Sequence, residues 1–206
     1  MSDQPPTQLS FAPPEILFKY DPDSKLKQYL DLLEAENRKI NLVSRETSRS
    51  DLVRLSAESL LPFEVVKAHQ FLNYLDIGSG GGFPAFPIIM SLKPTKSVLV
   101  ERTNKKASAL KRMSKQLGIQ VEIFDRNFDE CEFSGKFDLI TLRLVKLTGP
   151  LLKKISNLLD RRGVFIYYSK LADEIITKNL SETKYAYTLE VHSPIKSFTV
   201  FSKIAG

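Results

Sequence analysis

The stretch that decides the fold is Leu75-Asp76-Ile77-Gly78-Ser79-Gly80-Gly81-Gly82-Phe83-Pro84. The apolar run 74–77, where the stretch begins, predicts a buried parallel strand, and the segment 84–92, where it ends, predicts a helix. Glycines at alternate positions let the backbone turn sharply and approach a bound ligand with no side chain in the way. The stretch therefore predicts a ligand-binding turn between a strand and a helix.

A second apolar strand ends in a carboxylate about 20 residues after the glycine turn, the spacing at which an acid reaches a ribose. This strand is expected at 97–101, and its last residue is Glu101. A carboxylate there can accept hydrogen bonds from both ribose hydroxyls. The two strands together indicate a nucleoside-containing cofactor at their ends. A purely structural turn and a nicotinamide cofactor remain open at this point.

Strand and helix patterns alternate from residue 74 onward. Expected strands are 74–77, 97–101, 120–124, 137–142 and 163–168, and expected helices are 84–92, 104–117, 148–160 and 170–181, with one turn near 128–132. Two final strands, 184–192 and 197–204, are joined by a link too short for a parallel crossover, so they form an antiparallel hairpin. We predict an α/β, doubly wound sheet that is mostly parallel and ends in this hairpin.

The N-terminal region precedes the alternating pattern. Residues 1–23 hold five of the chain's 11 prolines and predict an extended arm. Helices expected at 25–42 and 49–61 form an N-terminal helical cap. Their capping residues are expected to be Asp23-Ser24 and Ser48. The expected division is an arm at 1–23, a cap at 24–66 and a core at 67–206, with cap and core forming one domain over 24–206.

The composition narrows the classes of function. A chain of 206 residues with 42% hydrophobic content can bury a core without disulfides. Cys131 is the only cysteine and His69 and His192 the only histidines, which argues against a metal site or a histidine-centred triad. No apolar run approaches the ~20 residues that cross a bilayer, and no secretory signal pattern is present. We expect a cytoplasmic monomer with no membrane partner.

The net charge of +6 is unevenly distributed. Between Arg102 and Lys115 there are six basic residues and no acidic one. On the predicted helix, Ala107, Leu110, Met113 and Leu117 share one side, whereas Lys105, Lys111, Arg112 and Lys115 share the other. The charged side is either a solvated surface or a ridge that contacts phosphates, and the pattern does not choose between them.

The chain resembles the small-subunit (16S) ribosomal RNA methyltransferase G family, also called glucose-inhibited division protein B. Asp76 before the first glycine is typical of methyltransferase loops, since nicotinamide-binding loops usually have an apolar residue there. The resemblance runs from about residue 25 to residue 170. It includes Tyr29-Leu30-Asp31-Leu32-Leu33, Asn41-Leu42-Val43-Ser44, Leu52-Val53-Arg54, Glu58-Ser59-Leu60, the loop ending in Phe83-Pro84, Glu101 with Lys105, Phe137-Asp138-Leu139-Ile140 with Arg143, and Gly163-Val164-Phe165 with Lys170.

The resemblance implies a class I, Rossmann-like methyltransferase fold with S-adenosylmethionine (S-adenosyl-L-methionine) as cofactor. It implies methyl transfer to ring nitrogen 7 of a guanine in 16S ribosomal RNA, as naked RNA or as the small ribosomal subunit. The lone pair of that nitrogen is free at neutral pH, so the reaction needs positioning and electrostatics rather than a general base. The alternatives are a class I methyltransferase for a small molecule or a protein, and a cofactor-binding regulator without catalysis.

Site residues follow from the loop and from the resemblance. The expected cofactor-binding residues are Asp76, Gly78, Ser79, Gly80, Gly82, Phe83, Glu101, Arg126 and Asn127. Arg143, after the fourth central strand, is the expected catalytic residue, gripping a phosphate or the guanine oxygen. The expected RNA-binding residues are Arg54, Lys105, Lys111, Arg112, Lys115 and Lys170. Leu55, Leu142 and Leu144 stand where the family commonly has His, Ser and Ala, which marks a divergent member.

Overall fold

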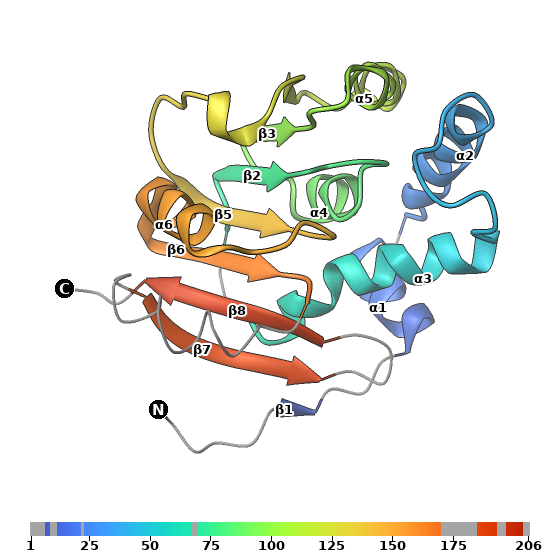
Figure 1. Cartoon of the computed structure of the whole chain (residues 1–206). Helices are drawn as coiled ribbons and strands as arrows, with labels where there is room; N and C mark the ends of the chain where they lie inside the picture. The colour runs from blue at the N-terminus through green and yellow to red at the C-terminus, as the bar shows by residue number, and fades with distance from the viewer. Residues whose placement is uncertain are drawn as a thin grey trace.

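One mixed β-sheet organises the chain, with helices on both of its faces (Figure 1). This computed structural model describes residues 7–8, 12–21, 23–66, 70–169, 185–192 and 197–203. The strands are β1 (Thr7–Gln8), β2 (Asn73–Ile77), β3 (Lys96–Val100), β4 (Glu122–Phe124), β5 (Phe137–Leu142), β6 (Leu159–Tyr167), β7 (Tyr185–His192) and β8 (Ser197–Lys203). The helices are α1 (Pro13–Tyr20), α2 (Leu26–Asn37), α3 (Arg49–Leu60), α4 (Ala85–Leu92), α5 (Asn104–Gln116) and α6 (Gly149–Leu158), with short 3₁₀ turns η1 (Leu61–Glu64) and η2 (Phe128–Glu130).

The strand order among the described residues is β1-β7-β8-β6-β5-β2-β3-β4. Strands β2, β3, β4, β5 and β6 pair with one another in parallel, whereas β8 is antiparallel to both β6 and β7. The predicted parallel sheet with a C-terminal antiparallel hairpin is confirmed. The chain leaves β2 toward β3 on one side and returns to β5 on the other, so a crevice opens at the carboxyl ends of β2 and β5.

The sheet separates two apolar cores. Alternate residues of β2 point to opposite faces, so Tyr74 packs with the cap helices, α4 and α5, whereas Leu75 packs with α6. On the cap side, the buried residues of α2 are Leu26, Tyr29, Leu30, Leu33 and Glu36. The cap is therefore part of the main core and not a separate appendage.

Local structure differs from the sequence prediction at the N-terminus. The prediction of an extended arm is wrong for residues 13–20, which form α1 and pack on α3 with Ile16 buried. The prolines at 13 and 14 occupy the first turn of that helix, where no amide hydrogen bond is lost. Asp21 caps α2 in place of Asp23-Ser24, since its carboxylate accepts from the amides of Lys25 (2.8 Å) and Leu26 (3.0 Å).

Other predicted boundaries shift by a few residues. Helix α2 ends at Asn37 rather than at 42, because the Asn37 side chain accepts from the amides of Leu42 (2.8 Å) and Val43 (3.0 Å) and turns the chain. Ser48 caps α3 as predicted, in a capping box with Asp51. Strand β6 begins at Leu159, earlier than predicted. The helix predicted at 170–181 lies outside the described residues.

Replacing Gly82 with alanine should destabilise the fold. A Cβ at this position, where φ is +99°, would lie 2.5 Å from Cδ2 of Phe86 and 3.1 Å from the hydroxyl of Tyr29. Overpacking together with left-handed strain should lower the free energy of unfolding by about 2–4 kcal/mol. Gly118→Ala is the matched control, because Gly118 has φ +66° and a Cβ added there would meet no atom within 4 Å. Urea unfolding should show a loss of about 1 kcal/mol for the control. Equal losses in the two variants would contradict the packing argument.

Candidate active site

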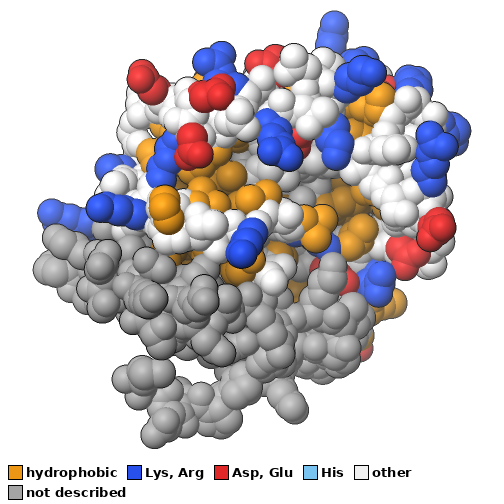
Figure 2. All heavy atoms as spheres, viewed as in Figure 1, with side chains coloured by type: hydrophobic (Ala, Val, Ile, Leu, Met, Phe, Trp, Pro, Cys, Tyr) orange, Lys and Arg blue, Asp and Glu red, His pale blue; other side chains and the backbone are white. Residues whose placement is uncertain are grey.

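A cavity of about 760 Å³, here called the cleft, lies at the carboxyl ends of β2, β3 and β5. Its floor is the glycine loop, its walls are the segments that follow β3, β4 and β5, and the cap contributes Leu42, Val43 and Leu55. Figure 2 shows hydrophobic side chains gathered in the middle of the described surface, with Lys and Arg side chains around them. The cleft therefore combines an apolar interior with a polar, basic margin.

Backbone hydrogen bonds fix the glycine loop against strand β3. The amides of Gly78 (2.8 Å) and Ser79 (3.1 Å) both donate to the carbonyl of Val100. Gly78 and Gly80 have positive φ angles of +77° and +54°, which glycine adopts without strain. Gly78, Ser79, Gly80 and Phe83 line the cleft, together with Gly81. Gly82 does not line it, and its role in the structure is to make room for Phe86.

Glu101 ties the glycine loop to the segment after β3. Its Oε2 accepts from the amide of Gly80 (2.9 Å) and its Oε1 from the amide of Thr103 (2.8 Å). The side chain is buried but borders the cleft. Each carboxylate oxygen can accept a second hydrogen bond, so the group is oriented in advance and keeps capacity toward the cleft.

Asp76 lies behind the glycine loop and does not itself line the cleft. Thr141 donates to its Oδ1 (2.5 Å) and Tyr74 in turn is hydrogen-bonded to Thr141 (2.8 Å), whereas Oδ2 has no hydrogen-bond partner among the described residues. Burial raises the pKa of Asp76 to about 6, because the charged form is poorly solvated there. A buried carboxylate with an unpartnered oxygen is stabilised in its charged form by a ligand group that is cationic or donates a hydrogen bond.

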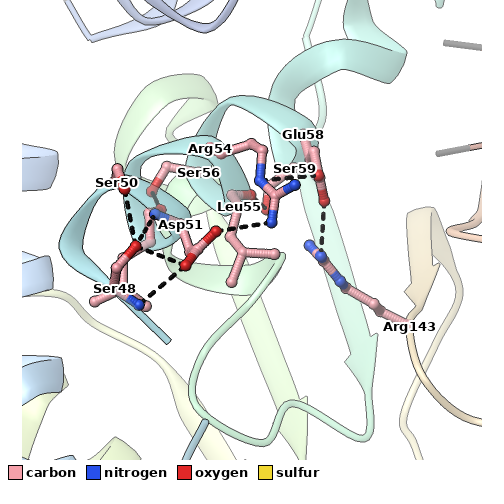
Figure 3. Close-up of polar contacts among 10 residues, drawn as sticks. Ser48, Ser50, Asp51, Arg54, Leu55, Ser56, Glu58, Ser59 and Arg143 are labelled. Carbon is pink, nitrogen blue, oxygen red and sulfur yellow. Dashed lines mark hydrogen bonds and ion pairs between the residues drawn. The ribbon is translucent and has the colours of Figure 1, made fainter. Parts of the chain in front are cut away.

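Arg143 is a buried partner of the cap rather than a free side chain. Its Nη2 donates to Oε2 of Glu58 on α3 (2.9 Å), and the two side chains are only 4% and 5% exposed. Figure 3 shows Arg143 reaching from the loop after β5 toward Glu58, beside Arg54 on the same helix. Arg143 borders the cleft, and its Nη1 is buried with no hydrogen-bond partner in the part of the chain that the structure describes. The guanidinium thus keeps one donor group for a ligand.

The turn after β4 contributes the remaining predicted cofactor residues. Arg126 and Asn127 are exposed and line the cleft beside the buried ring of Phe128. The Arg126 guanidinium lies over the ring of Phe124, 5.9 Å from its centroid, and the Asn127 side chain donates to Glu130 (3.0 Å). The structure therefore brings this turn to the same cleft as the glycine loop and Glu101.

The predicted RNA-binding residues fall into separate places. Helix α5 exposes four of them on one surface, called the outer face of α5 from here on: Lys105, Lys111, Arg112 and Lys115. None of these four residues lines the cleft. Lys111 is paired with Asp125 (3.0 Å) and Arg112 with the buried Glu36 (2.5 Å). Arg54 is half-buried and paired with Asp51 (3.0 Å). Lys170 lies outside the described residues.

Four basic side chains at the margin of the cleft are called the basic rim here: Arg102, Lys106, Arg126 and Lys146. None of them has an ion-pair partner within the described ranges. Sequence reasoning selected only Arg126 from this set. The position of the other three along the chain could have identified them, because each comes shortly after a strand whose carboxyl end borders the cleft. Arg102 and Lys106 follow the end of β3, and Lys146 follows the end of β5.

The described part of the chain contains neither a membrane-spanning helix nor a cluster of metal-ligating side chains. No helix there is long and apolar enough to span a membrane. No group of three or more His, Cys, Asp or Glu side chains there is placed to hold a metal ion.

Comparison with known sequences identifies one family. The family model described as "GidB: rRNA small subunit methyltransferase G" matches residues 23–199. "Ribosomal RNA small subunit methyltransferase G" from Borrelia hermsii (strain HS1 / DAH) is 31% identical over 170 residues, which cover 82% of this chain and 81% of the relative. The protein of the same name from Chlorobaculum tepidum is 36% identical over 166 residues, covering 78% of this chain and 75% of the relative.

Comparison with solved structures shows the fold. Cofactor-bound Rv0187 from MTB superposes with a TM-score of 0.65 at 16% identity, covering 91% of this chain and 98% of that chain. The ribosomal protein L11 methylase from Lactobacillus delbrueckii subsp. bulgaricus superposes with a TM-score of 0.59 at 17% identity, covering 73% and 79%. The chain therefore has the class I methyltransferase fold that its sequence predicted.

Asp76 should make stability depend on pH in a defined direction. Its pKa rises from 3.8 in the unfolded chain to about 6 in the fold, so the folded state holds an extra proton between these values. Its contribution to the free energy of unfolding should fall by about 2–3 kcal/mol as the pH rises from about 4 to about 7. Urea unfolding of wild type and Asp76→Asn across this range should show the difference between them changing by that amount. A difference that does not vary with pH would contradict the assignment.

Removing Glu58 should be far more destabilising than removing an exposed ion-pair partner. Glu58→Ala leaves the buried Arg143 without its counter-charge, which should lower the free energy of unfolding by about 3–5 kcal/mol. Glu34→Ala is the control, because Glu34 pairs with Arg49 on the surface (3.0 Å) and such pairs contribute about 0–1 kcal/mol. Thermal and urea unfolding would measure both. Similar small losses would show that Arg143 does not depend on Glu58.

Proposed function

The chain belongs to the rRNA small subunit methyltransferase G family, and we propose that it transfers a methyl group from S-adenosylmethionine to ring nitrogen 7 of a guanine in 16S ribosomal RNA. The observation that carries the proposal is one cleft that joins the glycine loop and Glu101 to Arg143, inside a rim of unpaired basic side chains. We further propose that the protein acts as a monomer, because residues of one chain line the whole cleft, and that it acts in the cytoplasm, because its proposed substrate is ribosomal RNA.

The residues at the base of the cleft fit the chemical groups of S-adenosylmethionine. Glu101 would hold the ribose hydroxyls with the acceptor capacity left on its two oxygens. The unpartnered Oδ2 of Asp76 suits the cofactor's ammonium group, reached through water because Asp76 lies just behind the loop. Arg126 and Asn127 would border the adenine. When bound, the cofactor supplies an electrophilic methyl group on a sulfonium, and the chain's own residues need only align the acceptor with it.

Arg143 is proposed to orient the target base. The unpartnered Nη1 can donate to O6 of guanine, leaving the neighbouring N7 lone pair free to attack the methyl carbon. With the cofactor bound, the C–S bond would break as the N7–C bond formed, so positive charge would move from sulfur to the purine. An unpaired arginine beside that ring would oppose this movement of charge. Glu58 offsets the charge of Arg143, so the pair can hydrogen-bond to the base without repelling it.

The basic rim supports an RNA substrate over a small molecule. Unpaired Lys and Arg side chains around a cleft attract a phosphate backbone and release its counterions. The outer face of α5 is a weaker candidate, because Lys111 and Arg112 are already engaged with acidic partners. We propose that the rim makes the main phosphate contacts, with Lys105, next to Lys106 in the first turn of α5, extending it.

A methyl-transfer assay tests the reaction. Small ribosomal subunits, and 16S RNA extracted from them, should both come from cells that lack this enzyme, so that the site is unmodified. With S-adenosylmethionine labelled in the methyl group, label should enter RNA as 7-methylguanine, which nucleoside chromatography identifies. Label in another nucleoside, in ribosomal protein alone or in neither substrate would contradict the proposal.

Rim and helix variants separate the two basic surfaces. Lys106→Ala/Lys146→Ala should weaken RNA binding and reduce the slope of log affinity against log salt by about 1–2, because two phosphate contacts are lost. Lys111→Ala/Lys115→Ala removes the same charge from the outer face of α5 and serves as the control, with a slope change below about 1. Filter binding over a salt series would measure both. A larger effect in the α5 double variant would move the RNA path to that helix.

A further inference from the structure

Leu144 is an apolar side chain that the fold leaves outside. It is 90% exposed, although it stands between Arg143, whose side chain is 4% exposed, and the partly buried Val145. Its φ of +58° places it in the left-handed region, which reverses the direction of the chain and turns the side chain outward. Leu144 borders the mouth of the cleft.

The packing of the chain gives no reason for a leucine at this position. A left-handed backbone strains leucine, whereas glycine or asparagine adopts it readily. An exposed leucine also gains nothing from burial. Val145, by contrast, packs on the loop, since its Cγ2 would lie 2.7 Å from a Cβ added at Gly78. Strain that the rest of the fold holds in place is typical of residues that contact a ligand.

The neighbours of Leu144 indicate which ligand it meets. Leu55 and Val145 extend an apolar surface from it into the cleft, and Lys146 of the basic rim lies two residues further along the chain. An apolar point surrounded by unpaired cations matches a nucleic acid, in which stacked bases alternate with phosphates. A protein or lipid partner would be expected to meet a broader apolar face than one leucine.

Methyl transfer inside the cleft places a geometric demand on the RNA. The major groove of an A-form helix is too deep and narrow for side chains to read, and N7 faces that groove. A base that reacts in a cleft must leave its stack, and the gap it leaves favours an apolar side chain. Leu144 is exposed at the cleft, next to the Arg143 that the proposed function assigns to the target base.

We propose that Leu144 is an apolar wedge that packs against the bases flanking the target guanine and takes its place in the stack while the guanine occupies the cleft. The inference rests on the proposed RNA substrate. The wedge then contributes to the rate of the bound complex more than to cofactor affinity. It also explains why a strained and exposed leucine stands where asparagine or glycine would suit the backbone better.

Substitutions that relieve the backbone strain test the wedge. Leu144→Asn and Leu144→Gly should unfold at the same temperature as wild type or higher. S-adenosylmethionine affinity by calorimetry should stay within about twofold, and RNA affinity by filter binding within about threefold. Single-turnover methyl transfer to 16S RNA at saturating concentrations should slow by about tenfold or more, because a base-stacking contact is lost. Leu144→Met should retain most of the rate, since it keeps an apolar side chain of similar reach.

Leu72→Asn is the matched control. Leu72 is also an exposed leucine, at 48%, but it precedes β2 at the end of the sheet opposite the cleft. Its substitution should leave the single-turnover rate within about twofold of wild type.

The outcomes distinguish this inference from the function on which it rests. If wild type methylates RNA and Leu144→Asn does so equally fast, the wedge is refuted and the proposed function stands. If cofactor affinity falls as much as the rate, Leu144 belongs to the cofactor site and the wedge is also refuted. Loss of a dimer in Leu144→Asn, seen by light scattering, would refute it in favour of a contact between two copies. If wild type methylates no RNA, the function and the wedge fail together.

Discussion

The contact between Tyr29 and the glycine loop is the constraint on which the structure depends. The fully buried Tyr29 of α2 donates its hydroxyl hydrogen to the carbonyl of Gly81 (3.0 Å), and its ring packs edge-on against Phe83 and Phe86. A side chain at Gly82 would occupy the same space. Burial of one aromatic ring therefore fixes the cap on the sheet and fixes the loop in its left-handed path. The floor of the cleft is thus set by core packing, before any ligand binds.

The buried charged side chains around the glycine loop and the cap are better explained by function than by stability. Asp76, Glu58 and Arg143 are all buried, and each keeps one side-chain atom with no hydrogen-bond partner among the described residues. Buried ion pairs often stabilise a protein no more than apolar residues of the same size, because desolvation offsets their attraction. Keeping both the ion pair and the unpartnered atoms makes sense where a bound ligand supplies the missing hydrogen-bond partners. In the proposed function, the ammonium group of the cofactor serves Asp76 and O6 of the guanine serves Arg143.

Sequence reasoning succeeded where the determinants are local. The strand, turn and helix around the glycine loop, the acid that follows β3 and the Ser48 cap each depend on residues close together in the chain, and the structure has all three. The cofactor roles of the loop and of Glu101 stay predictions. Pairings over long separations were not predictable in this way. Arg143 meets Glu58 across 85 positions and Arg112 meets Glu36 across 76, so only the packing of cap on core reveals them. The proline-rich α1 was missed for a different reason, since the same prolines that favour an extended chain also suit a first helical turn.

The distribution of charge follows the demands of the proposed reaction. At the margin, where the RNA backbone carries full negative charge, the chain leaves the cations of its basic rim unpaired among the described residues. Inside, where the purine gains positive charge, the one arginine is neutralised by a carboxylate from the cap. If the rim cations were paired and Arg143 were unpaired, RNA binding would be weaker and methyl transfer would be opposed by the charge of the arginine. The helical cap therefore does more than cover the sheet, because it supplies the carboxylate that pairs with Arg143, the residue proposed to stand beside the reacting base.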